Sequence, residues 1–141
     1  MTRSGLSMIG QSTAYAVEKG TNMNELAKLH CSKIDAKTPR LNKSDISQLE
    51  AKLRGWRTYE KDGEVRLEKI FKCDDFRKAV AFTNRIAQAA NEEDHHPAIL
   101  TEWGKVTVTW WTHKIKGLHQ NDFIMAAKTE SLYGDQHGSD K

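Results

Sequence analysis

The sequence predicts an α+β fold in which a four-stranded antiparallel sheet carries helices packed on one face, in the order α-β-β-α-β-β-α. Segments with apolar residues at helical spacing alternate with pairs of short segments in which apolar and polar residues alternate. The two segments of each pair are joined by a tight, glycine-containing turn, which is typical of antiparallel hairpins. Helices that alternate with hairpins in this way bury their apolar faces against one side of the sheet.

The composition is that of one soluble domain. The chain has 141 residues, of which 29% are charged, and its mean hydropathy is −0.71. No apolar run approaches the roughly 20 residues that span a bilayer, so we expect no membrane partner. The net charge of +3 is spread along the chain, which argues against nucleic acid as a partner. Cys31 and Cys73 lack CxxC spacing and are expected to be free thiols in a cytoplasmic protein.

The two ends of the chain carry little pattern. Residues 1–22 are rich in Ser, Thr and Gly, without a continuous apolar stretch or cleavage signal, and we expect a disordered leader there. Residues 23–40 form an N-terminal arm in which two leucines three residues apart can share one face of a helical turn. We place the folded domain at residues 41–133 and a flexible tail at 134–141.

The first half of the domain predicts one helix and one hairpin. Ser44 is a suitable N-cap for a helix over residues 45–54, whose apolar residues fall on one face. Residues 56–59 are expected to form a strand, and Lys61-Asp62-Gly63 a tight turn. Residues 64–72 are expected to form the partner strand of this hairpin.

The alternation of that partner strand is broken by Lys69 and Ile70, which allows a bulge or a strand end near them. Asp74 or Asp75 then caps a second helix over roughly 76–91. The residues expected on the inner face of this helix are Phe76, Ala79, Val80, Thr83, Ile86, Ala87 and Ala90.

The second hairpin and a last helix complete the domain. Residues 98–101 and 105–111 are expected to form strands on either side of a glycine-containing turn. A loop then leads to a helix that begins at Asn121 or Asp122 and ends near residue 132.

Two adjacent histidines held by a proline are the most unusual local feature. Pro97 fixes its own φ and favours extended geometry at His96, so the rings of His95 and His96 should leave a stiffened backbone in different directions. Imidazole is the side chain best suited to exchange protons near neutral pH. We expect His113 to join them if the loop after the second helix lies beside the end of the last strand.

Other residues extend this candidate site. Asp122 can orient one imidazole, and Trp103 offers a flat surface for stacking a planar heterocycle. Because the sequence has no nucleophile elbow or phosphate-binding loop, we predict proton transfer on a bound small molecule. Three alternatives stay open: the histidines satisfy only loop backbone, they bind zinc with a carboxylate, or Asp122 is only an N-cap. Trp110 and Trp111 are expected to lie in the core on one side and at an interface or pocket rim on the other.

The spacing of these residues resembles the signature of the pterin-4a-carbinolamine dehydratases. The matching positions are Asp94-His95-His96-Pro97, then Trp103 after five residues, His113 after nine more and Asp122 after eight more. The resemblance covers about residues 41–132. The run over 101–111, with Gly117-Leu118 and Asn121-Asp122-Phe123, is similar to the bacterial branch associated with phenylalanine hydroxylase.

The resemblance implies a hydro-lyase that converts 4a-hydroxytetrahydropterin to quinonoid dihydropterin and water, with the pterin as substrate and with neither a cofactor nor a metal ion. It implies catalytic roles for His95, His96 and His113, and substrate-binding roles for Asp94, Trp103 and Asp122. Our hypothesis assigns proton transfer to His95 and His113 and ring binding to His96. Asn91 departs from the family, which commonly has an acidic residue there; neighbouring Glu92, Glu93 or Asp94 can supply the charge.

The resemblance also implies partners. We expect a homodimer or homotetramer that recycles the pterin cofactor for an aromatic amino-acid hydroxylase such as phenylalanine hydroxylase. The alternative is a protein-binding module, because mammalian members serve as dimerisation cofactors of a transcription factor, with catalysis incidental. The natural pterin, the oligomer size and the role of residues 1–40 stay open.

Overall fold

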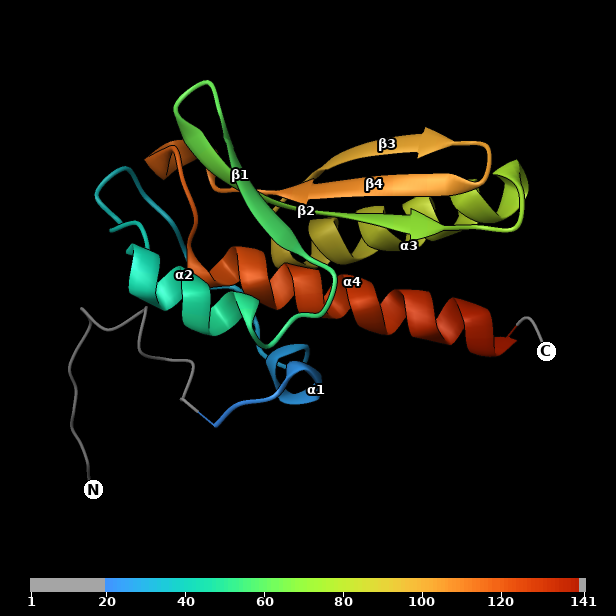
Figure 1. Ribbon diagram of the computed structural model, residues 1–141, viewed down its shortest axis with the longest axis horizontal. Helices are drawn as coiled ribbons and strands as arrows, with labels where there is room; N and C mark the ends of the chain where they lie inside the picture. Colours follow the sequence, from blue (N-terminus) through green and yellow to red (C-terminus); the bar gives the residue numbers. More distant parts are fainter. Residues whose placement is uncertain (1–19, 140–141) are drawn as a thin grey trace.

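A computed structural model describes residues 20–139 of the chain, with side chains to residue 134. Figure 1 shows the arrangement of its elements. In chain order these are α1 (Met23–Leu26), α2 (Lys43–Glu50), β1 (Arg57–Lys61), β2 (Glu64–Lys72), α3 (Phe76–Glu93), β3 (Ala98–Glu102), β4 (Lys105–Trp110), the 3₁₀ helix η2 (His113–Ile115) and α4 (Gln120–Ser139). The predicted fold class and element order are confirmed, with the one-turn helix α1 added in front. The leader expected over residues 1–22 lies outside the described residues, apart from its last three.

The four strands form one antiparallel sheet in the order β1-β2-β4-β3. The two-residue loop Asp62-Gly63 joins β1 to β2, and its φ values of 55° and 79° are the left-handed values of a type I′ hairpin turn. The ladder between β2 and β4 runs without a break from Leu67 opposite Trp110 to Lys72 opposite Lys105. The bulge or strand end considered near Lys69 is therefore absent.

Lys69 keeps its place on the inner face of β2, opposite Val108, because its charge is compensated. Its ammonium forms an ion pair with Glu130 of α4 and donates to the backbone carbonyl of Arg54 at 3.1 Å. Glu130 also accepts a hydrogen bond of 2.9 Å from the indole N–H of Trp56. A buried charge is tolerated where each polar group has a partner. The alternation broken in the sequence is thus intact in the sheet.

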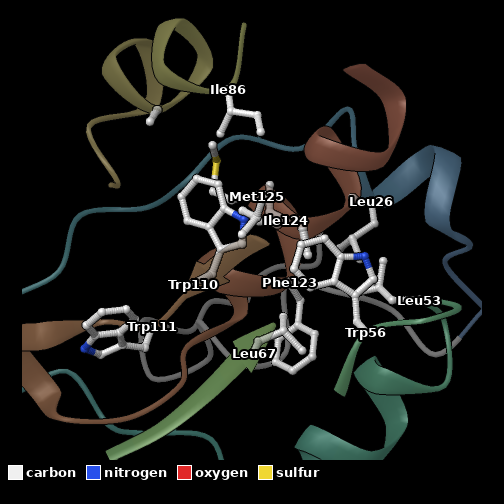
Figure 2. Close-up of a cluster of buried hydrophobic side chains, with 14 of the residues drawn as sticks. Leu26, Leu53, Trp56, Leu67, Ile86, Trp110, Trp111, Phe123, Ile124 and Met125 are labelled. Atoms are coloured by element: carbon white, nitrogen blue, oxygen red, sulfur yellow. The ribbon is translucent and has the colours of Figure 1, made fainter. Parts of the chain in front are cut away.

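The hydrophobic core lies between the sheet and the helices α3 and α4, which cover one face of the sheet (Figure 1). The sheet contributes Leu67, Phe71, Val106, Val108 and Trp110, and the two helices contribute Ala79, Phe82, Ile86, Ala90, Phe123, Ile124 and Met125. The core stripe of α3 includes Phe82, which the sequence did not indicate, whereas Phe76 in the first turn is 49% exposed. Figure 2 shows Trp110 beside Met125 in this cluster, with the next indole, Trp111, turned aside.

Several helix boundaries differ from those expected, among them the end of α2, which lies at Glu50 and not at residue 54. α2 begins at Lys43 because Asn42, not Ser44, accepts the capping hydrogen bond from the Asp45 N–H at 2.8 Å. α4 continues past residue 132 to Ser139, so the tail expected at 134–141 is helical as far as the description extends. A single glycine in a helix costs about 1 kcal/mol but does not end it without a left-handed residue or proline. Within residues 20–139, no helix combines the length and apolarity needed to cross a bilayer.

Candidate active site

His95 follows the C-terminus of α3 at a turn that fixes its direction. Asp94 has a left-handed backbone (φ 53°, ψ 44°), and the His95 N–H donates to the carbonyl of Ala90 at 3.1 Å. This bond is that of a Schellman motif, with aspartate where glycine is usual. His95 is 8% exposed, and its ring stacks on the core indole of Trp110 with 5.9 Å between ring centroids. The backbone and the core together hold this imidazole in place.

Asp122 is fully buried and bonds three groups from different segments. Its Oδ1 lies 2.6 Å from His95 Nε2. Its Oδ2 accepts from the Thr112 hydroxyl at 2.8 Å and from the His119 N–H at 3.0 Å. A carboxylate can only accept, so His95 Nε2 carries a proton and the ring keeps Nδ1 for another partner. Since α4 begins at Gln120, Asp122 is not the N-cap but a residue of the first turn.

His119, which precedes α4, takes the place of an N-cap residue. Its Nδ1 accepts the Asn121 N–H at 3.0 Å, while Asp122 accepts the His119 N–H, so the two side chains cap the helix reciprocally. His119 is 1% exposed, and its Nε2 has no hydrogen-bond partner among the described residues. Burial lowers the pKa of His119, and the neighbouring Asp122 carboxylate only partly opposes this shift. Nothing around His119 in the sequence indicated this role.

The other two predicted histidines are exposed and come from separate loops. His96 Nε2 lies 3.0 Å from Oδ1 of Asn91, which stands one turn back on α3. His113 begins η2, and its ring contacts the indole of Trp111 with 4.6 Å between centroids. His95, His96 and His113 all line one cavity. The expected meeting of the loop after α3 with the end of β4 is therefore present.

The cavity has a volume of about 540 Å³, within the range of roughly 300–1,000 Å³ typical of small-molecule sites. Besides the three histidines it is lined by Glu93, Asp94, Trp111, Thr112, Lys114 and the arm residues Cys31–Ile34. Asp94, predicted to bind substrate, is thus at the cavity, and Asp122 lies behind His95. Burial, reinforced by the nearby Glu93 charge, raises the pKa of the Cys31 thiol to about 12. Among residues 20–139, no group of three His, Cys, Asp or Glu side chains is arranged to hold a metal ion.

Trp103 is the predicted site residue that the structure does not bring to this cavity. It lies in the turn between β3 and β4 and is 72% exposed, whereas the cavity is at the opposite end of that hairpin. Five strand residues at about 3.3 Å each separate the two ends by roughly 16 Å. Trp111 lines the cavity instead, with the Arg66 guanidinium 4.0 Å from its ring centroid. The sequence predicted one residue of the Trp110-Trp111 pair in the core and the other at an interface or pocket rim, and Trp111 is the one at the pocket.

Glu93 is the acidic residue near Asn91 whose carboxylate lines the cavity and is held by the arm. It accepts the Cys31 N–H at 2.7 Å and lies 2.7 Å from His30 Nδ1. Burial alone would raise the pKa of Glu93, but the hydrogen bonds from Cys31 and His30, together with the charge of Lys128, bring it below its usual value. The charge missing at Asn91 is thus present two residues later.

The sequence did not indicate that the arm lines the cavity. Residues 31–34 contact elements about 60 to 90 positions away, and no local pattern signals contacts of that range. The one available signal was polar residues near the ends of elements: Glu93 ends α3 and Asn121 lies in the first turn of α4, where capping or long-range bonds are common.

Comparisons with known proteins give a consistent result. The sequence profile described as pterin 4 alpha carbinolamine dehydratase matches residues 39–132. A relative from Microcystis aeruginosa, whose name assigns it provisionally to pterin-4-alpha-carbinolamine dehydratase, is 49% identical over 115 residues, which is 82% of this chain and 99% of the relative. A crystal structure from Brucella melitensis, described as a transcriptional coactivator/pterin dehydratase, is 32% identical with a TM-score of 0.62 and covers 68% of this chain and 100% of its own.

Proposed function

The chain belongs to the pterin 4 alpha carbinolamine dehydratase family, and on this premise we propose that it removes water from a 4a-hydroxytetrahydropterin to give the quinonoid dihydropterin. One observation carries the proposal. Imidazoles from two loops, at positions 95, 96 and 113, line one cavity of a size suited to a small molecule, and a buried carboxylate holds the first of them.

The reaction requires one proton to be delivered and another to be removed. The C4a–O bond breaks as the hydroxyl group receives a proton and leaves as water. The N5–H proton departs, and the electron pair of the N5–H bond forms the C4a=N5 double bond. Positioned acid–base groups contribute about 10²–10⁴-fold to such a reaction. Because the protein has only to deliver and remove protons while water leaves, and no electrons are exchanged with another molecule, side chains can supply this catalysis.

The proposal assigns the proton transfers to His95 and His113 and pterin binding to His96. His95 suits a proton-transfer role because Asp122 can stabilise its charged imidazolium form. Since Asp122 occupies Nε2, Nδ1 is the nitrogen left for the substrate. His113 comes from the other loop, so the two rings can serve different atoms of the pterin. His96 bonds Asn91 and is exposed, in keeping with a binding role.

The aromatic wall belongs to Trp111 in this proposal, because Trp111 lines the cavity and Trp103 does not. An indole face gives a planar bicyclic ligand a stacking surface. Asp94 stands at the cavity and can accept hydrogen bonds from the amino groups of a pterin. Trp103 keeps its predicted role only through the family resemblance.

In the cell, the proposal places the enzyme beside an aromatic amino-acid hydroxylase such as phenylalanine hydroxylase, whose spent cofactor it returns to use. Cysteines outside disulfides, as Cys31 and Cys73 are, are typical of a reducing compartment, so we place the protein in the cytoplasm. We expect a homodimer or homotetramer, measurable by light scattering. A role as a transcriptional coactivator is the alternative, because the description of the Brucella melitensis structure names both activities.

Stopped-flow measurement of carbinolamine breakdown, with and without the protein, tests the function. We expect the purified protein to accelerate breakdown, and a His95→Ala/His96→Ala double variant with an unchanged circular dichroism spectrum to lose at least about 100-fold. Activity that survives a chelator excludes the zinc alternative. A protein that leaves the spontaneous rate unchanged would refute the proposal and favour the binding module.

A further inference from the structure

The arm residues 31–34 line the cavity although they precede residue 39, where the match to the family profile begins. The arm is attached elsewhere by an apolar contact, since Leu26 of α1 is fully buried in the core. Of residues 31–34, Cys31 packs against the core, whereas Lys33 is exposed and Ser32 and Ile34 are half-buried. Core packing therefore does not account for the position of residues 32–34.

Asn121 fixes the arm with both atoms of its amide group. Its Oδ1 accepts the Ser32 N–H at 3.0 Å, and its Nδ2 donates to the Ser32 carbonyl at 2.8 Å. Asn121 is 1% exposed and Ser32 is half-buried, so this two-bond clamp is partly shielded from water, and such shielding strengthens hydrogen bonds. The clamp binds both backbone groups of Ser32, as a residue of a neighbouring strand would.

Two further contacts hold the segment on either side of the clamp. Glu93 accepts the Cys31 N–H at 2.7 Å, and the Lys114 ammonium donates to the Ile34 carbonyl at 3.4 Å. Figure 1 shows the arm passing the loop between β4 and α4. All three anchors adjoin the proposed catalytic groups: Glu93 is two residues before His95, Asn121 precedes Asp122, and Lys114 follows His113. The elements that present the catalytic side chains therefore also hold this wall of the cavity.

From these contacts we infer that residues 31–34 are a specificity-determining wall for the substituent at C6 of the pterin; this inference rests on the proposed function. C6 is bonded to N5, so a substituent at C6 lies next to the reacting edge of the pterin. With that edge beside the imidazoles, we place the substituent against residues 31–34. The wall offers the Lys33 ammonium and the Ser32 hydroxyl, whose oxygen can accept beside its 3.5 Å contact with Asn121 Oδ1, and these groups suit a hydroxylated substituent and not an alkyl one. The segment acts on binding and takes no part in proton transfer.

Asn121→Ala and Lys33→Ala test this inference in the full-length protein. The measured quantity is the ratio of kcat/KM for two carbinolamines, one with a dihydroxypropyl group and one with a methyl group at C6. We expect both variants to lower this ratio by roughly 3- to 10-fold, the worth of one hydrogen bond, through KM for the dihydroxypropyl pterin with kcat nearly unchanged. Asn84→Ala on the exposed side of α3 and Lys37→Ala in the arm are the matched controls, since neither residue lines the cavity.

The outcomes separate the two proposals. If the unmodified protein is inactive, the dehydratase function fails. If it is active and the ratio is unchanged in either folded variant, or if kcat falls equally for both pterins, the inference about the arm is overturned. Binding of 7,8-dihydrobiopterin and 6-methyl-7,8-dihydropterin, followed by tryptophan fluorescence, gives the same comparison without turnover. Lys33→Ala keeps the test valid should Asn121→Ala fail to fold, because no described contact involves the Lys33 side chain.

Discussion

Replacing Asp122 by asparagine changes one oxygen of the buried carboxylate into an N–H₂ group of nearly the same size. The amide oxygen can stay at the Oδ2 position, where it still accepts from Thr112 and His119. The amide nitrogen then faces His95 Nε2 at the 2.6 Å contact, and it can only donate. His95 must therefore give up its Nε2 proton and carry it on Nδ1, so the nitrogen that faces the substrate becomes a hydrogen-bond donor where it was an acceptor.

The contacts of Asp122 set the expected magnitudes. Two of the three hydrogen bonds are unchanged in Asp122→Asn, and the third turns from a charge-assisted bond into a neutral one, so the free energy of unfolding should fall by about 1 kcal/mol. Alanine would leave three polar groups unpaired at about 1–3 kcal/mol each, which a small domain tolerates poorly. The wrong tautomer should lower kcat by about 10²–10⁴-fold, the full contribution of a positioned acid–base group.

Stopped-flow turnover and urea denaturation of the same Asp122→Asn preparation measure both effects. Asp75→Asn is the matched control, because it removes the same charge while asparagine remains a good cap for α3. The control should keep the turnover of the unmodified protein. Turnover by Asp122→Asn at the unmodified rate would refute the assignment of His95 as a proton-transfer group held by Asp122.

Three further predictions concern residues around the site. Because the pKa of His119 in the folded state lies below its unfolded value near 6.5, the free energy of unfolding should be highest above that pH and should fall as the pH drops below it. The variant His119→Ser keeps a capping oxygen. Urea denaturation should show that its free energy of unfolding falls less between pH 7.5 and 5.5 than that of the unmodified protein. With a pKa of about 12, Cys31 should resist iodoacetamide at pH 8 in a Cys73→Ser variant until urea is added; rapid labelling in the native state, detected by mass spectrometry, would contradict its burial. Trp111→Leu should raise KM for the pterin about 10-fold, the loss of one stacked ring, with a smaller change in kcat; an unchanged KM would remove Trp111 from the wall.

Local signals in the sequence were sufficient for the fold. The Asp62-Gly63 turn, the alternation of residues 64–72 and the helical spacing of α3 act within a few residues, and each corresponds to an observed element. The family resemblance is also confirmed, because it depended on fixed gaps between several residues and not on one motif. The start of the helix expected over residues 45–54 was misplaced by two residues because Asn42 and Ser44 are both good caps.

The site was predicted only as far as sequence spacing could reach. The convergence of His113 with His95 and His96 followed from the expected pairing of neighbouring strands. Trp103 was expected at the cavity because of its aromatic character, although the expected hairpin already placed it in the turn, at the end of the strands away from the histidines. The arm could not be placed, because the bonds between Ser32 and Asn121 link residues 89 positions apart and leave no periodic trace.

The short connection between α3 and β3 has a thermodynamic consequence. A left-handed residue, Asp94, precedes the two adjacent imidazoles and a ring-locked one, Pro97, follows them. A left-handed conformation costs a non-glycine residue roughly 1–2 kcal/mol. In the folded protein the loop that carries the two imidazoles therefore has little conformational freedom left. The loop is therefore preorganised for binding, and a bound small molecule loses little binding free energy to ordering the loop.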